Sequence, residues 1–166
     1  VTYLFLYTPL KRLTPLSTIL GGIPGALPPV MGWTAVRNEL SNEALVLFAI
    51  LFFWQMPHFF SLAWMYRKDY ARAGYRMLTV LDNSGSRTSA AVLGCTTGLV
   101  LVSILPAIGG YVGTVYLMIA VLLGLCFLAT GITLYFTRSN ASARVVFFAS
   151  LVYLPVLLLV MVIDRV

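Results

Sequence analysis

The sequence predicts an all-α fold, a polytopic transmembrane helix bundle. Of its 166 residues 60% are hydrophobic and only 10% are charged, and the mean hydropathy is +0.95. Soluble domains carry about 25% charged residues. Several apolar stretches also reach the ~20 residues that a helix needs to cross a bilayer. The net charge is +6, and the basic residues that produce it lie in short segments between these stretches. Basic residues in such positions set the orientation in the membrane and give no reason to expect a nucleic-acid partner.

Five complete spans and the end of an earlier one account for the chain. The residues 1–8 are apolar and end just before two basic residues, so we expect them to leave the membrane there. Because the chain starts within a span and without Met, we expect 1–166 to be a single transmembrane domain that forms the C-terminal part of a longer protein. The complete spans are predicted over 16–36, 44–66, 88–108, 113–136 and 145–163.

Basic residues alternate between the segments that connect these spans. The positive-inside rule places the richer set of segments, 9–15, 67–87 and 137–144, on the cytoplasmic or matrix side. The other connections and the C-terminus contain only Arg37 and Arg165. The residues predicted on the inner side are Lys11, Arg12, Arg67, Lys68, Arg72, Arg76, Arg87, Arg138 and Arg144.

The span 16–36 is unusually rich in glycine and proline. Gly21 and Gly25 form a pair of small residues at a spacing that lets helices approach closely. Three prolines, at positions 24, 28 and 29, remove backbone donors and are expected to bend or break the helix. Such a segment either lines a cavity shielded by protein or is a kinked packing helix, and the sequence leaves both open.

The span 44–66 carries polar residues along one face. At 100° per residue its polar positions and the loop carboxylate that follows fall within an arc of about 80°. Polar groups at membrane depth usually face a pocket or a path. The alternative is that the histidine hydrogen-bonds to a neighbouring helix and the aspartate is an ordinary loop charge. The positions on this face are Gln55, His58, Leu62, Tyr66 and Asp69.

Two basic pairs, Lys11–Arg12 and Arg67–Lys68, are predicted at the same membrane face. Arginine binds phosphate oxygens with a fork of donors and lysine adds a point charge, so converging pairs would hold a diphosphate. The alternative is that they set topology and anchor lipid headgroups. Asp69 and Asp82 are the only acids predicted at this face. Magnesium on a diphosphate usually takes one or two carboxylates, so further acids would have to come from elsewhere.

Several runs of this sequence resemble the haem O synthase (protohaem IX farnesyltransferase) family of intramembrane UbiA-type prenyltransferases. They are YTPLKRLT at 7–14, GALPPVMGW at 25–33, WQMPHF at 54–59, RKDY at 67–70 and FFASL at 147–151. The resemblance implies a nine-helix bundle with an active site that opens to the inner face, of which this chain would supply the end of helix four and helices five to nine. It also implies that the first Asn/Asp-rich motif lies in a missing N-terminal half, so these residues alone are expected to be inactive.

The resemblance further implies transfer of a farnesyl group from farnesyl diphosphate to a vinyl group of haem B, which gives haem O for terminal oxidases. Mg²⁺ would assist, and haem B would be a substrate and not a prosthetic group. Asp69 and His58 are the implied catalytic residues, with Asp69 as metal ligand and His58 positioning water or a haem propionate. The implied substrate-binding residues are Lys11, Arg12, Gln55, Tyr66, Arg67, Lys68 and Tyr70.

The expected partners are farnesyl diphosphate, haem B, the lipid bilayer and haem A synthase or oxidase assembly proteins, with no nucleic acid. A bacterial inner membrane is expected rather than a mitochondrial one, since no transit segment is seen. Two other functions stay open at this point. One is an intramembrane prenyltransferase that acts on a quinone-ring precursor, and the other is a transporter whose polar helix face forms a substrate path.

Overall fold

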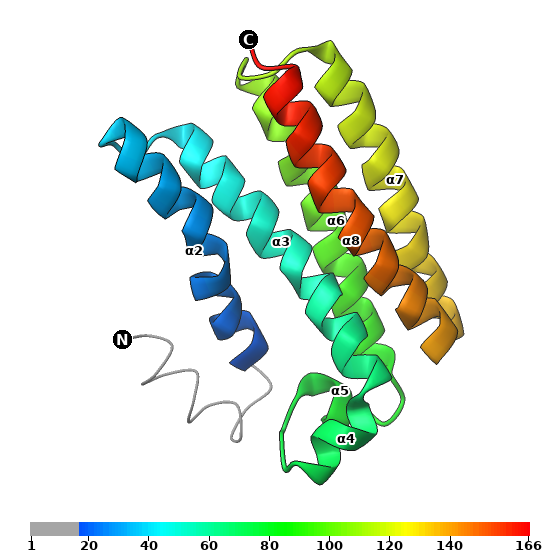
Figure 1. The fold of residues 1–166 in the computed structure, drawn as a ribbon. Coiled ribbons are helices and arrows are strands. Elements are labelled where there is room, and N and C mark those ends of the chain that lie inside the picture. Colours follow the sequence, from blue (N-terminus) through cyan, green and yellow to red (C-terminus); the bar gives the residue numbers. More distant parts are fainter. Residues whose placement is uncertain (1–16) are drawn as a thin grey trace.

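The computed structural model describes residues 17–166, which fold as a bundle of long helices with no strand among them (Figure 1). The segment 1–8 and the pair Lys11–Arg12 lie outside the described residues. The long helices are α2 (Ser17–Arg37), α3 (Asn42–Met65), α6 (Ser86–Ile108), α7 (Thr114–Thr137) and α8 (Asn140–Ile163). Two short helices, α4 (Arg67–Arg72) and α5 (Leu78–Leu81), lie between α3 and α6.

Four helices, α3, α6, α7 and α8, are long and apolar enough to cross a membrane. The predicted all-α polytopic membrane bundle is therefore confirmed, and the chain is an integral membrane protein. The helix α2 follows the predicted range and continues through Pro24, Pro28 and Pro29 without ending. Its crossing of the membrane stays a prediction.

The start of α8 lies upstream of the predicted position 145. The helix begins at Asn140 because Ser139 caps it, its hydroxyl oxygen accepting a hydrogen bond from the Ser142 amide at 3.1 Å. Hydropathy places the start at the first long apolar run, whereas the cap stabilises a polar first turn that precedes it.

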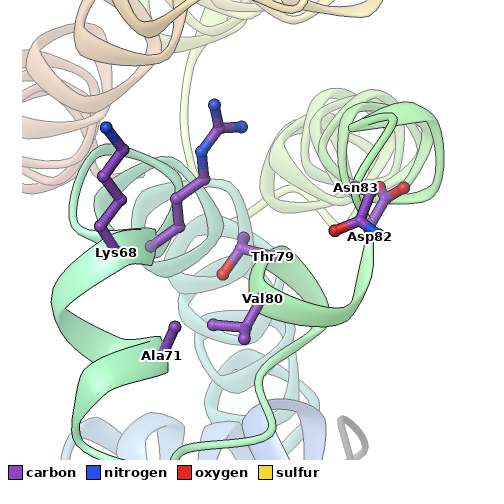
Figure 2. A pocket seen from close by; sticks show the side chains of 7 residues that line it. Lys68, Ala71, Thr79, Val80, Asp82 and Asn83 are labelled. Carbon is purple, nitrogen blue, oxygen red and sulfur yellow. The ribbon is translucent and has the colours of Figure 1, made fainter.

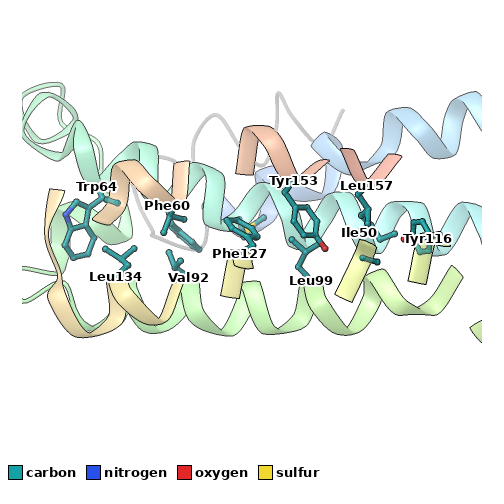
Figure 3. Close-up of a cluster of buried hydrophobic side chains, with 14 of the residues drawn as sticks. Ile50, Phe60, Trp64, Val92, Leu99, Tyr116, Phe127, Leu134, Tyr153 and Leu157 are labelled. Atoms are coloured by element: carbon teal, nitrogen blue, oxygen red, sulfur yellow. The ribbon is translucent and has the colours of Figure 1, made fainter. Parts of the chain in front are cut away.

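The helix α3 is the centre of the bundle. It packs against α2, α6 and α8, and α7 closes the other side by packing against α6 and α8. The core between these helices includes Ile50, Leu99, Phe127 and Leu157 (Figure 3). Small residues let α3 approach closely: Gly22 and Gly25 face Met56 and Gln55, and Gly98 faces the ring of Phe53.

Two tyrosine hydroxyls in the core are paired between helices. The hydroxyl of Tyr116 donates to the backbone carbonyl of Ser103 at 2.9 Å, and the Ser103 and Tyr153 hydroxyls lie 2.8 Å apart. A bilayer offers no water to such groups, so these bonds fix the register of α6, α7 and α8.

The basic residues divide between the two ends of the bundle as the sequence predicts. At one end α3, α4 and α7 end and α6 and α8 begin, as Figure 1 shows. We call this the cationic end. Of the basic residues that the structure describes, it carries Arg67, Lys68, Arg72, Arg76, Arg87, Arg138 and Arg144, whereas Arg37 and Arg165 lie at the opposite end.

Two glycines of the cationic end allow a matched test of packing. Gly74 and Gly85 both have a left-handed backbone, with φ of 74° and 69°, but only at Gly85 would a Cβ atom meet the Trp64 indole. We expect Gly74→Ala to cost about 1–2 kcal/mol of unfolding free energy from backbone strain. Gly85→Ala should cost a further ~1–3 kcal/mol from overpacking. Thermal unfolding in detergent measures both, and equal losses would contradict the packing of Trp64 described here.

Candidate functional site

A pocket of about 290 Å³ opens at the cationic end, between α4 and the turn from α5 to α6 (Figure 2). We call it the cationic pocket. Its lining combines two cations, a hydroxyl, a carboxylate and an amide. The lining residues are Arg67, Lys68, Ala71, Thr79, Val80, Asp82 and Asn83.

The end of α3 sets the position of the cations. The helix ends at Tyr66, and α4 begins directly with Arg67 and Lys68. The Arg67 guanidinium carbon lies 5.5 Å from the centroid of the Trp64 ring, and Trp64 itself is buried. This cation–π contact holds a half-buried arginine at the pocket without using its hydrogen-bond donors on a carboxylate. Those donors are thus available to an anion.

The hydroxyl of Thr79 is the unusual feature of the cationic pocket. The Thr79 side chain is buried, and its oxygen has no hydrogen-bond partner among the described residues. A buried hydroxyl without a partner costs about 1–3 kcal/mol. Trp33, Ser41 and Trp64 also have an enclosed atom without a partner, and such groups are explained by a catalytic role, strain or a bound water or ion. No sequence pattern points to Thr79, because a threonine in a short loop helix is an ordinary residue.

The carboxylate of Asp82 has a structural role. It accepts hydrogen bonds from the Thr88 amide at 2.8 Å, from the Thr88 hydroxyl at 3.0 Å and from the Ser84 hydroxyl at 3.0 Å. Burial raises the pKa of Asp82, but these hydrogen bonds outweigh burial and hold its pKa below the ordinary value of 3.8. Asp82 therefore ties the loop to the first turn of α6.

The other acid of the cationic end, Asp69, is exposed. One of its oxygens lies 3.6 Å from an Arg72 guanidinium nitrogen, and Asp69 does not line the cationic pocket. Nearby, the side chain of Tyr66 is exposed, and the rings of Tyr70 and Tyr75 lie edge to face at 5.9 Å. No group of three or more potential metal ligands occurs among residues 17–166. These residues do not form a magnesium site by themselves.

In the middle of α3 the polar side chains diverge toward two neighbours. The Gln55 amide donates to the Gly22 carbonyl of α2 at 2.6 Å. His58 Nδ1 lies 2.8 Å from the Ser150 hydroxyl of α8, and the Trp54 indole donates to the Ser150 carbonyl at 2.7 Å. No residue of the predicted polar face lines the cationic pocket. The pocket is lined instead by Arg67 and Lys68, which directly follow Tyr66 in the chain.

Residues 1–152 of the chain match the UbiA prenyltransferase family. The chain belongs to the UbiA prenyltransferase family. The family resemblance inferred from the sequence runs is thereby confirmed.

Curated relatives are similar over nearly the whole chain. A protoheme IX farnesyltransferase of Solibacter usitatus is 49% identical over 99% of the chain, which covers 56% of that protein. The protein of the same name from Koribacter versatilis is 42% identical, again over 99% of the chain and 56% of the relative. A mitochondrial protoheme IX farnesyltransferase of Arabidopsis thaliana is 39% identical over 100% of the chain and 38% of its own length. The chain thus spans about half the length of the bacterial relatives, and no solved structure matches it.

The role of Asp82 predicts a pH-dependent stability. Since its folded pKa is lowered, the stabilisation is complete above about pH 3.8 and is lost as the pH falls through the folded pKa. Asp82→Asn should therefore cost about 0.5–2 kcal/mol at neutral pH, the range of a lost helix cap. The difference from the parent protein should shrink below pH 3.8.

Unfolding midpoints measured from pH 3 to 8 check this expectation. The exposed Asp69→Asn is the matched control and should change stability by less than about 1 kcal/mol, as is usual for surface ion pairs. A gap between parent and Asp82→Asn that stays constant down to pH 3 would argue against the hydrogen-bonded carboxylate.

Proposed function

We propose that the protein to which this chain belongs transfers a farnesyl group from farnesyl diphosphate to a vinyl group of haem B, and so forms haem O. Its curated relatives are named protoheme IX farnesyltransferase. The observation that carries the proposal from the structure is the cationic pocket, in which two cations and an unpaired buried hydroxyl meet at the end of an apolar membrane helix.

The diphosphate would occupy the cationic pocket. When the allylic carbon–oxygen bond breaks, both electrons leave with the diphosphate, so negative charge grows on its oxygens. The Arg67 fork and the Lys68 ammonium donate hydrogen bonds toward that charge, and the enclosed Thr79 hydroxyl is proposed to reach it when the lining side chains move apart around the ligand. Donors that are held in place before the reaction stabilise the transition state more than mobile water does. Lys11 and Arg12 are proposed to add positive charge at the same face.

A divalent metal, Mg²⁺, would neutralise the diphosphate charge when it is bound. Asp69 is the described residue that would offer a carboxylate to it, directly or through water. The described residues do not complete such a site, so the remaining ligands would have to come from other parts of the protein.

The isoprenoid tail would lie against apolar side chains inside the membrane. Ile23 and Leu27 of α2 and Phe59 of α3 remain exposed in this structure, at 41%, 40% and 45% of their surface. An isoprenoid packed against them would keep bulk water from the allylic cation. Water has to reach the site once, because the product carries a new hydroxyl group, and Gln55 is proposed to help orient substrate near α2.

Localisation and partners follow the same reasoning. The positive-inside rule puts the cationic end, and thus diphosphate entry, on the cytoplasmic side of a bacterial inner membrane, or on the matrix side in a mitochondrion. We favour the bacterial membrane, since the relatives with the highest identity given above are bacterial. Haem A synthase or oxidase assembly proteins are the proposed partners that receive the product.

Removing either pocket cation should slow the reaction. We expect Arg67→Ala and Lys68→Ala in the complete protein to lower kcat/KM for farnesyl diphosphate by about 10²-fold, as for the loss of one preorganised donor. Arg76→Ala is the matched control, an exposed arginine of the same connection that does not line the pocket. Haem O is quantified by chromatography of membranes supplied with haem B and farnesyl diphosphate. Prenylation of a quinone-ring precursor with haem B left unchanged would overturn the proposal.

The substitution Thr79→Val distinguishes a role of the hydroxyl in diphosphate binding from a role in protein stability. Valine has nearly the same shape but no hydroxyl, so we expect the ligand-free protein to gain up to about 1–3 kcal/mol of stability. The same substitution should weaken the binding of inorganic diphosphate. Calorimetric titration and thermal unfolding of one preparation measure both effects. Unchanged diphosphate affinity would show that the hydroxyl does not serve this ligand.

A further inference from the structure

Two apolar hollows adjoin on the outer side of α8, in the half of the helix that lies at the cationic end. The first, of about 270 Å³, lies between α7 and α8, which pack side by side (Figure 1). The second, of about 480 Å³, lies over α8 alone. We call them the paired hollows, because Ala141 and Val145 line both. The first also includes Ala129, Thr130 and Thr133, and the second Phe148, Ala149 and Val152.

The surface of the paired hollows suits an apolar occupant. The side chains of Val145, Phe148 and Val152 are 54%, 57% and 59% exposed. The two threonines of the first hollow already donate within α7, Thr130 to the Phe127 carbonyl at 2.7 Å and Thr133 to the Ala129 carbonyl at 2.8 Å. Their hydroxyl hydrogens are therefore not directed at a ligand, and what remains for contact is hydrocarbon.

The length of the paired hollows corresponds to one leaflet of a bilayer. From Ala141 to Val152 the helix advances eleven residues, which is about 16 Å of rise. Half of a hydrocarbon core of ~30 Å is about 15 Å. Because α8 begins at Asn140, the hollows run from the cationic end to about the middle of the membrane. An acyl chain of the leaflet at the cationic end has the same extent.

An unpaired cation stands at the mouth of the second hollow. Arg144 is exposed and lines this hollow. In the described part of the chain no carboxylate lies within ion-pair distance of it or of Arg138 in the same connection, because Asp69 pairs with Arg72 and Asp82 is hydrogen-bonded to α6. An arginine without a carboxylate partner has its fork of donors available for phosphate oxygens.

We propose that the paired hollows bind one anionic phospholipid, with its phosphate on Arg144 and one acyl chain in each hollow. Two adjoining apolar hollows with a cation at one end match a molecule that has two chains and one phosphate. The leaflet on the cytoplasmic side carries the anionic lipids, and basic pockets of membrane helices on that side bind their headgroups. A zwitterionic lipid fits less well, because its own cation would lie near Arg144 and Arg138. The inference does not depend on the proposed reaction.

Native mass spectrometry of the complete protein, stripped of lipid in detergent and titrated again, tests the charge. The test compares phosphatidylglycerol with phosphatidylcholine that carries the same two oleoyl chains. We expect Arg144→Gln to weaken the tightest phosphatidylglycerol site about fivefold, the usual effect of one basic residue near an anionic headgroup, and to leave phosphatidylcholine unchanged. Arg76→Gln is the matched control, an exposed arginine of the same end that lines neither hollow.

A second variant tests the chains. Ala141 is exposed and lines both hollows, so Ala141→Leu should fill them and weaken both lipids without unfolding the protein. Glycerol 3-phosphate, which has the phosphate but no chains, should not bind. Equal affinity of the parent for the two lipids, or phosphatidylglycerol binding that neither variant weakens, would overturn the proposal. So would a protein that takes up no lipid because its own N-terminal helices cover α8, or one whose spectrum shows two copies joined there.

Discussion

The structure depends on one constraint: a polar group inside a bilayer has to find its partner within the protein. On the helix α3, the polar groups of Trp54, Gln55 and His58 have partners on neighbouring helices. Gln55 reaches a carbonyl of α2, and Trp54 and His58 reach Ser150 of α8. Such bonds contribute about 0.6–2 kcal/mol each in membrane proteins. They select one rotation of α3 in a bundle whose apolar surfaces would allow several, and thereby place both ends of the proposed site.

The two ends of the site lie on a single continuous helix and its direct extension. From His58 to Arg67 the chain advances nine residues, which corresponds to about 13 Å of helix rise. In the proposed reaction the allylic carbon of farnesyl diphosphate is bonded directly to the diphosphate, so the haem vinyl group has to come close to the cationic pocket. Since α3 carries His58 and leads directly into Arg67, a rigid α3 would fix the distance between mid-membrane depth and the cationic pocket.

The long helices could be predicted from the sequence because each depends on a continuous apolar stretch bounded by polar or basic residues. The predicted spans match the long helices, and the start of α8 differs because a serine cap stabilises a polar first turn. Sequence patterns could not predict which helix supplies the hydrogen-bond partner of each polar side chain. Helical projection places Gln55 and His58 on one face, but it does not say that α2 lies beside one and α8 beside the other. Likewise, Asp69 and Asp82 look alike in the sequence, and only the fold shows that Asp82 is hydrogen-bonded to α6 whereas Asp69 is exposed.

The most direct measurement is a structure of the complete protein in nanodiscs with a non-hydrolysable farnesyl diphosphate analogue. We expect the diphosphate to lie in the cationic pocket, within hydrogen-bond distance of Arg67, Lys68 and Thr79, with the isoprenoid running into the membrane beside α3. A diphosphate bound at the opposite end of the bundle, or out of reach of all three side chains, would contradict it.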